Sequence, residues 1–209
     1  MKSQLSELQT RVLEALRGVD PPWTLTGGGA LAGFHLGHRT TRDLDLFFHG
    51  ASDLGDVPRV VEGLLRAAGI TVSVLRSAPS FRSLDARDGG QRTLVDLVAD
   101  PVATIESPIE IRPGIWVDTL HEILVNKLCA VLGRAAIRDL VDIGALLDAG
   151  GDFDRALRDA PLKDSGFSPP TLAWLLRELD IAALASSSAL DPLPLVALRD
   201  SLVARLLRS

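Results

Sequence analysis

The sequence contains no tyrosine, and aromatic residues make up only 4% of its 209 residues. Proteins that hold single-stranded nucleic acid commonly stack its bases on aromatic side chains, so an aromatic stacking platform is excluded. Positive charge is also scarce, because the formal net charge is −5 at pH 7. A protein that holds nucleic acid through many phosphate contacts is usually basic, so any nucleic acid must meet a local basic patch or be held briefly.

Cysteine and long apolar runs are scarce as well. Cys129 is the only cysteine, so an internal disulfide cannot form and we expect a reducing cytoplasm. No apolar run approaches the length needed to cross a bilayer, and residues 1–18 carry charges throughout. We therefore expect neither a membrane span nor a signal peptide.

The hydrophobic pattern changes character near residue 118. Before it, periodicity predicts helices at 3–17, 30–36 and 58–68, with Ser3 as the first cap, and strands at 23–26, 43–48, 70–75, 80–86 and 92–98, with an edge strand at 115–117. Asp88-Gly89-Gly90 is typical of a hairpin turn.

The rest of the chain is helical in pattern. Helices are predicted at 120–132, 135–148, 153–160, 170–184 and 193–207, with a small-residue linker at 185–188. We therefore predict an α+β fold, in which a small mixed β-sheet core at 1–118 precedes a C-terminal helical subdomain at 119–209.

Three consecutive glycines, Gly27, Gly28 and Gly29, lie between a predicted strand and a predicted helix. Glycine allows positive φ and close approach of a ligand to the backbone, and the amides at a helix start favour an anion such as phosphate. The alternative is a tight turn with no ligand, and the glycines alone favour that alternative.

Asp43 and Asp45 alternate with leucine on a predicted strand. Alternate residues of a strand share a face, so both carboxylates point the same way and repel unless a cation lies between them. Mg²⁺ prefers oxygen ligands and often takes one or two carboxylates together with substrate phosphates. The alternative is a solvated strand whose acids pair with Arg39 and Arg42.

Asp96 is a candidate third carboxylate, because it lies within an apolar strand where an acid needs a partner. It is a candidate metal ligand or general base. The alternative is an ion pair with Arg92, and Asp85 is the substitute candidate for the third acid.

The apolar stretch from 121 to 147 contains several charged residues, among them Lys127, Arg134, Arg138, Asp139 and Asp142. A lysine on an apolar helix can neutralise triphosphate charge, so we assign Lys127 to phosphate. The alternative is an internal network in which the arginines pair with the aspartates and join two helices, and we assign Arg138 to such a structural role.

Several of these motifs together resemble the AbiEii/AbiGii-like nucleotidyltransferase toxins. The resemblance rests on Gly27–Leu31, His38–Phe47, Val95–Val98 and the stretch from Lys127 to Asp142, in that order, and it covers residues 25–147. One position departs from the family pattern, since Gly29 stands where members often carry serine or threonine.

The resemblance implies a polymerase-β-like nucleotidyltransferase fold and transfer of a nucleotide from a nucleoside triphosphate with release of pyrophosphate. It implies metal binding by Asp43 and Asp45, a phosphate pocket shaped by Arg39 and Thr41, nucleotide contact by Lys127, and a helical acid at Asp139 or Asp142. Some members are toxins that add nucleotides to the 3′ end of transfer RNA and are opposed by a separate antitoxin.

We therefore predict an enzyme that uses Mg²⁺, or Mn²⁺ in its place, to transfer a nucleotide to an acceptor hydroxyl on RNA, in the manner of these toxins. The predicted partners are a nucleoside triphosphate, an RNA acceptor and a cognate antitoxin. Two other readings stay open. One is an antibiotic-type transferase that modifies a small molecule. The other is a non-catalytic module that binds a nucleotide or a partner, and it stays open because Gly29 replaces a residue with a hydroxyl group.

Overall fold

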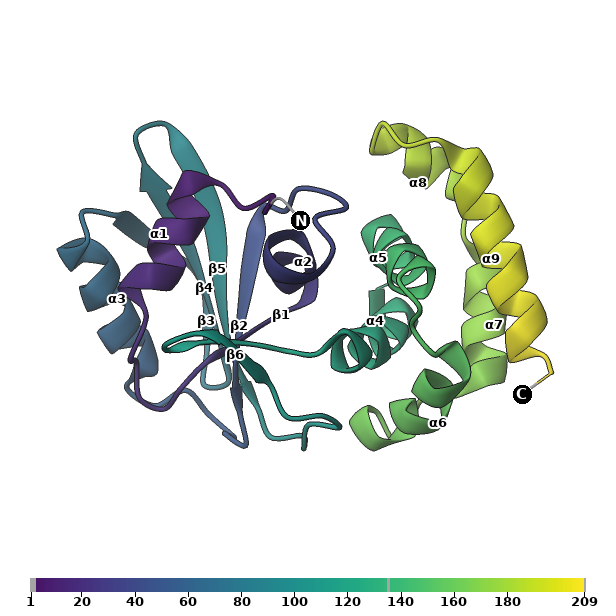
Figure 1. The fold of residues 1–209 in the computed structure, drawn as a ribbon, viewed down its shortest axis with the longest axis horizontal. Coiled ribbons are helices and arrows are strands. Elements are labelled where there is room, and N and C mark those ends of the chain that lie inside the picture. Colours follow the sequence, from purple (N-terminus) through teal and green to yellow (C-terminus); the bar gives the residue numbers. More distant parts are fainter. Residues whose placement is uncertain (1–2, 135, 209) are drawn as a thin grey trace. The chain divides into compact units, whose positions relative to one another are not determined.

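The structure, a computed structural model, describes residues 3–134 and 136–208. It divides into two compact units, Met1–Thr119 and Leu120–Ser209 (Figure 1). The first unit contains a mixed β-sheet with helices, and the described part of the second is helical, so the predicted α+β class is confirmed. The predicted boundary lies one residue earlier, after residue 118. That the units are separate domains stays a prediction.

The first unit is built on a seven-stranded sheet. Its strands are β1 (Thr24–Thr26), β2 (Asp43–His49), β3 (Thr71–Ala78), β4 (Phe81–Asp88), β5 (Gln91–Asp100), β6 (Ile109–Arg112) and β7 (Ile115–Val117). Their order is β3-β4-β5-β2-β1-β7-β6. The pairs β2–β5 and β1–β7 are parallel and the other pairs are antiparallel, so the sheet is mixed.

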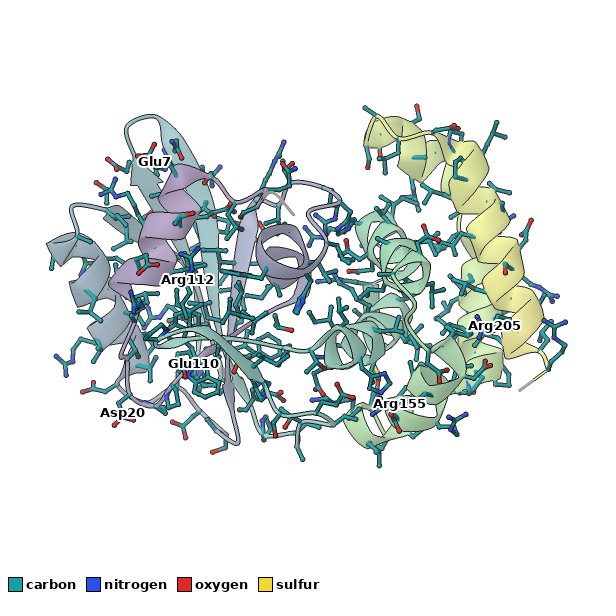
Figure 2. The ribbon with its side chains drawn as sticks, in the orientation of Figure 1. Glu7, Asp20, Glu110, Arg112, Arg155 and Arg205 are labelled. Carbon is teal, nitrogen blue, oxygen red and sulfur yellow. The ribbon has the colours of Figure 1, made fainter. Side chains whose placement is uncertain are left out.

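The prediction for β7 was wrong in one respect, because β7 is not an edge strand. The short strand β6, which the sequence pattern did not reveal, pairs with it and forms the edge. Arg112 of β6 forms an ion pair with the Glu14 carboxylate at 3.4 Å, and Arg112 is labelled in Figure 2. The β4–β5 turn is as predicted, with Gly89 and Gly90 at φ of 51° and 84°.

Three helical segments cover one face of the sheet, which we call the apolar face: α1 (Glu7–Ala15), α2 with its π-helical continuation η1 (Gly27–Ala30 and Leu31–His35), and α3 (Val57–Ala67). Leu44, Leu46 and Phe48 of β2 are buried on this face. Gln9 of α1 donates to the Thr93 hydroxyl of β5 at 3.3 Å, which places α1 over the same side.

Capping explains where α1 begins. Ser6, not the predicted Ser3, is the N-cap, because the Ser6 hydroxyl accepts from the Gln9 amide and the Gln9 side chain accepts from the Ser6 amide. This reciprocal capping box satisfies two amides that a helix start otherwise leaves unpaired. Helix α1 is therefore shorter than the helix that we predict at residues 3–17.

The second unit contains α4 (Leu120–Arg134), α5 (Ile137–Asp148), α6 (Phe153–Lys163), α7 (Pro169–Glu178), α8 (Ile181–Ser187) and α9 (Pro192–Leu206). The single helix predicted at 170–184 is two helices, because the Asp180 side chain accepts from the Ala183 amide and starts α8 anew. Consequently the predicted linker at 185–188 is mostly helical. The predicted start of the fifth helix, Ala135, lies outside the described residues.

Cys129 of α4 is partly buried, and its thiol donates weakly to the Ala160 carbonyl of α6 at 3.7 Å. Burial raises the pKa of this thiol to about 11. Within residues 3–134 and 136–208, no helix combines the length and the apolar character that a membrane crossing requires.

Candidate active site

Asp43 and Asp45 lie on the face of β2 opposite to the apolar face. The burial of β2 alternates strictly, with the leucines and Phe48 buried and Asp43, Asp45, Phe47 and His49 partly exposed. Because side chains alternate along a strand, both carboxylates project from one side, as the sequence predicted. We call this side the carboxylate face.

Asp96 lies directly beside Asp45. The parallel pairing of β2 with β5 matches Asp45 with Asp96, so the two carboxylates share the carboxylate face. The Ser83 hydroxyl of β4 donates to Asp96 Oδ1 at 2.5 Å.

Arg92, the alternative partner considered for Asp96, instead forms an ion pair with Asp85 at 2.8 Å. Asp85 also binds Arg87 at 2.7 Å, and the hydrogen bonds from Arg87 and then Arg92 lower the pKa of Asp85. The substitute candidate Asp85 is therefore held by two arginines.

The glycine turn closes against Asp45. Gly27 has φ of +59°, a conformation that side chains with a Cβ rarely adopt. A Cβ placed on Gly27 would lie 2.9 Å from Asp45 Oδ2. Glycine at this position is therefore required both by the turn and by the carboxylate behind it.

Gly28 brings two further predicted residues to the turn. A Cβ on Gly28 would lie 2.9 Å from a terminal nitrogen of Arg39 and 3.3 Å from the Thr41 hydroxyl. Thr41 is itself fixed by the backbone of Asp43, since its hydroxyl lies 3.3 Å from the Asp43 carbonyl. Arg39, Thr41 and the first two glycines thus meet beside Asp45.

Gly29 faces the other way. A Cβ there would lie 3.0 Å from Leu25 and 3.4 Å from Leu44, both of which are buried on the apolar face. A serine at this position would direct its Cβ toward leucine and not toward the carboxylates. The close packing of Leu25 and Leu44 against Gly29 therefore explains why glycine stands at this position.

The carboxylates of Asp43 and Asp45 offer oxygen ligands, which Mg²⁺ prefers. Thr26 of β1 pairs with Asp45, and its buried hydroxyl oxygen has no hydrogen-bond partner among the described residues. An unpaired buried hydroxyl is costly, so a ligand or ion at this point would stabilise it.

Asp43, Asp45 and Thr26 therefore fit a metal that completes its coordination with substrate oxygens. Across the described ranges, no group of three or more His, Cys, Asp or Glu side chains is gathered closely enough to hold a metal ion. The third-ligand role of Asp96 stays a prediction.

The predicted residues of the helical unit form a buried cluster of their own. The Lys127 ammonium lies 2.7 Å from Asp139 Oδ1 and 2.7 Å from Asp142 Oδ2, and both aspartates are fully buried. Arg134 adds a second partner for Asp139 at 2.8 Å. Burial alone would raise the pKa of Asp139, but Arg134 and Lys127 outweigh it and lower that pKa. The charged network between α4 and α5 is therefore present, and it includes Lys127.

One cluster on the carboxylate face was missed. His49 Nδ1 lies 3.0 Å from Asp100 Oδ2, and His49 Nε2 lies 3.4 Å from Asp118 Oδ1. Burial disfavours the charged ring, but hydrogen bonds to Asp100 and Asp118 raise the pKa of His49 to about 9. The even spacing of His49 from Asp45 and of Asp100 from Asp96 could have revealed that the pairs share a face.

No curated protein matches the chain. A presumed nucleotidyltransferase from H. pylori superimposes with a TM-score of 0.57 at 21% identity, covering 98% of each chain, and shows the same fold. The antibiotic-resistance factor ANT(2'')-Ia matches at 16% identity with a TM-score of 0.45, over 87% of this chain and 91% of its own.

A sequence profile of a whole family also matches. It is described as "Nucleotidyl transferase AbiEii toxin, Type IV TA system", and the match extends over residues 11–203, which is most of the chain. The chain therefore belongs to the AbiEii nucleotidyltransferase toxin family and is a nucleotidyltransferase.

Proposed function

We propose that the protein transfers a nucleotide from a nucleoside triphosphate to a terminal hydroxyl of RNA, the 3′ end of transfer RNA, in a Mg²⁺-dependent reaction that its antitoxin opposes. The observation that supports this most is the contact of the glycine turn with Asp45, with Arg39 and Thr41 against the same turn. It brings phosphate-binding groups and a carboxylate to one point. The cytoplasm is the compartment that fits this substrate.

Asp43 and Asp45 would hold the metal. When bound, Mg²⁺ (or Mn²⁺) would offset triphosphate charge and favour ionisation of the acceptor hydroxyl. The Thr26 hydroxyl, which is buried beside Asp45, would donate to a metal-bound water or to a phosphate oxygen. Two protein carboxylates are enough for Mg²⁺, because phosphates and water fill its remaining positions.

The glycine turn would receive the phosphates. The helix that starts at Gly27 has no side-chain cap, since Thr26 makes no capping hydrogen bond. The first amides of a helix lack intrahelical acceptors, so they can donate to phosphate oxygens. Arg39 would add a planar pair of donors and Thr41 a hydroxyl, which together orient the triphosphate.

The chemical step needs a base for the acceptor hydroxyl. The acceptor oxygen would form a bond to the α-phosphorus while the bond from that phosphorus to the bridging oxygen breaks, and pyrophosphate would leave with the electron pair. Asp96 would accept the hydroxyl proton, because it lies next to Asp45 and is oriented by Ser83.

Lys127 belongs to the proposal because its ammonium pairs with two carboxylates among the described residues and has a third N–H group. An ammonium has three N–H groups, and those of Lys127 that point to Asp139 and Asp142 hold it in place. The third would donate to the nucleotide. In this role the two aspartates are positioning residues for the lysine.

Labelled triphosphates test the proposal. The protein is incubated with each of four labelled nucleoside triphosphates, Mg²⁺ and total transfer RNA, and label on RNA is measured. We expect Asp43→Asn and Asp45→Asn to lose at least about 100-fold in rate, because each removes a charged metal ligand. Asp148→Asn, an exposed aspartate at the end of α5, is the charge-matched control and should keep full activity.

Other outcomes would overturn the RNA assignment. Pyrophosphate release that depends on an aminoglycoside and not on RNA would identify a small-molecule transferase. Triphosphate binding without transfer to any acceptor would identify a non-catalytic module. Growth arrest on expression, relieved by a co-expressed neighbouring gene product, would test the toxin role separately.

A further inference from the structure

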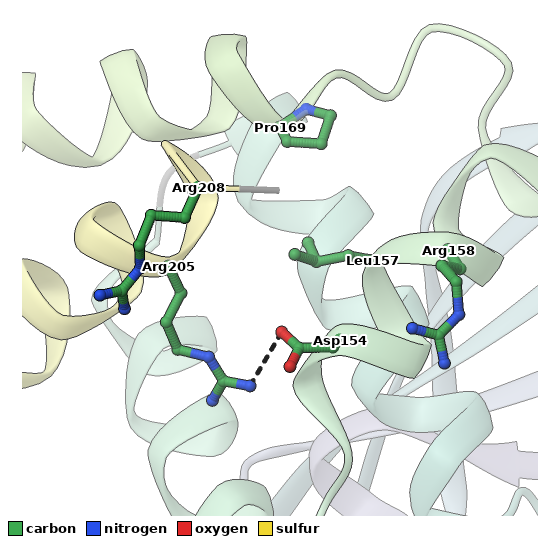
Figure 3. A pocket seen from close by; sticks show the side chains of 6 residues that line it. All are labelled: Asp154, Leu157, Arg158, Pro169, Arg205 and Arg208. Carbon is green, nitrogen blue, oxygen red and sulfur yellow. Dashed lines mark hydrogen bonds and ion pairs between the residues drawn. The ribbon is translucent and has the colours of Figure 1, made fainter.

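The helical unit contains a cavity of about 560 Å³ at the meeting of α6, α7 and α9 (Figure 3). It is lined by Asp154, Leu157 and Arg158 of α6, Pro169 of α7, Arg205 of α9 and Arg208 just after α9. Its volume is within the range of roughly 300–1,000 Å³ that small-ligand sites occupy. Three of its six lining residues are arginines, although the chain as a whole is acidic.

Two contacts already hold the side chain of Arg205 in place. Arg205 lies 3.0 Å from Asp154 Oδ1, as the dashed line in Figure 3 marks, and its guanidinium stands over the Phe153 ring at 4.5 Å from the ring centre. An ion pair and a cation–π contact together hold Arg205 in one orientation. Its charge is offset by Asp154, so it contributes shape more than net charge.

The other two arginines supply the net positive charge. Neither Arg158 nor Arg208 forms an ion pair with a carboxylate in the described part of the chain. Arg158 acts on Asp152 through its charge alone, since the pKa of Asp152 is lowered first by the Arg155 amide and, less strongly, by the charge of Arg158. Figure 3 shows Arg158 and Arg208 on opposite sides of Asp154 and Leu157, so an extended anion along the cavity would meet one guanidinium group on each side.

The lining distinguishes among anions. Guanidinium groups match the oxygens of phosphate in planar, paired hydrogen bonds. Leu157 and Pro169 offer an apolar wall on which a ribose can lie. Asp154 would repel a carboxylate, but its second oxygen can accept a hydrogen bond from a hydroxyl, and the 2′-hydroxyl is the group that separates RNA from DNA.

We infer that this cavity binds a ribose-phosphate segment of RNA, with Arg158 and Arg208 on phosphates and Asp154 on a 2′-hydroxyl. The inference rests on the proposed function for the identity of RNA as acceptor. It also explains how an acidic protein holds RNA, namely through one local patch of positive charge.

Binding of labelled transfer RNA, followed by fluorescence anisotropy at several salt concentrations, tests the inference without any transfer reaction. The double variant Arg158→Gln/Arg208→Gln should bind RNA at least about tenfold more weakly. The slope of log affinity against log salt should flatten by about 1.4, since each phosphate contact to a single strand contributes about 0.7. Arg177→Gln, an exposed arginine of α7 outside the cavity, is the matched control and should bind as the parent protein does.

Further binding measurements distinguish RNA from other ligands that carry negative charge. Asp154→Asn should reduce the preference for RNA over DNA of the same sequence. If the double variant binds RNA as the parent does, the inference fails. It also fails if the double variant loses affinity for inorganic phosphate or adenosine monophosphate but keeps the parent's affinity for RNA. The same holds if the double variant loses affinity for a glutamate-rich peptide and not for RNA.

Failure of the inference and failure of the proposed function give different results. RNA binding that depends on Arg158 and Arg208, in a protein that labels no acceptor, would reject the function and keep the cavity. RNA labelling with an unchanged KM for RNA in the double variant would keep the function and reject the cavity.

Discussion

Asp45 Oδ2 occupies the space beside Gly27 that a Cβ would need, at 2.9 Å from where that atom would lie. Gly27 directly follows strand β1 and Asp45 lies within strand β2, yet each restricts the other. The glycine is held at φ of +59° and the carboxylate is held against the start of a helix. This relationship makes the turn and the proposed metal ligand one structural element.

Replacing Gly27 with alanine should therefore damage both. The positive φ alone costs on the order of 1–3 kcal/mol in stability, and the new methyl group would push Asp45 aside. We expect a lower melting temperature and a loss of triphosphate binding, measured by differential scanning fluorimetry and by calorimetry.

Gly63→Ala is the control for that substitution. Gly63 is exposed within α3 and a Cβ there would meet nothing within 4 Å. Alanine in a helix interior should raise stability by about 0.5–1 kcal/mol and leave triphosphate binding intact. Equal behaviour of the two variants would contradict the role we give to the turn.

Asp96→Asn separates the two roles open to Asp96. If Asp96 is the general base, kcat should fall by about 100- to 10,000-fold while KM for the triphosphate and the Mg²⁺ concentration at half-maximal rate stay nearly constant. Steady-state kinetics across a Mg²⁺ titration measures both. A large rise in the Mg²⁺ requirement would instead identify Asp96 as a third ligand.

Lys127→Met should be severely destabilising. The substitution leaves Asp139 and Asp142 buried with less positive charge beside them, and breaking a buried pair costs about 3–5 kcal/mol. Adding Asp142→Asn should recover part of that loss, because it removes the carboxylate left without a lysine. Urea unfolding of the two variants gives the comparison, and a stable Lys127→Met protein would disprove the network.

Stability should fall between about pH 6.5 and pH 9 because of His49. Its pKa is raised in the folded protein from 6.5 to about 9, so its contribution is fully present below about 6.5 and is lost as pH rises through 9. The contribution is on the order of 3 kcal/mol, since each pKa unit corresponds to about 1.4 kcal/mol.

Chemical unfolding at several pH values checks this. His49→Gln should remove most of the fall in stability over that range. His121→Gln, which alters a histidine that pairs with Asp159 in the helical unit, should keep it. If the parent protein is equally stable at pH 6.5 and pH 9, the assigned cause is wrong.

Much of the carboxylate face could be predicted because it is local. The alternation of Asp43 and Asp45 with leucines is visible in the chain, and so is the burial of the strand that holds Asp96. The pairing of Asp45 with Asp96 could not be derived, since it depends on the register between strands that are far apart in sequence. The contact of His49 with Asp118 was missed for the same reason, since the two residues are 69 positions apart.

Other differences reflect competition between local signals. Two serines could cap the first helix, and Ser6 is used because only it has Gln9 three residues later. Hydrophobic periodicity continues through residues 170–184, but Asp180 caps a new helix there. In both cases a side-chain hydrogen bond to the backbone determined the boundary, which periodicity does not report.

Strand β2 has a consequence for how this enzyme can change over evolutionary time. Its side chains alternate between two environments, so adding or removing one residue within Asp43–His49 would turn the side chains on one side of the change to the opposite face of the sheet. The Gly89-Gly90 hairpin carries no such constraint, because both glycines stand clear of neighbouring atoms. Length variation among homologues should therefore accumulate at that hairpin and be excluded from β2.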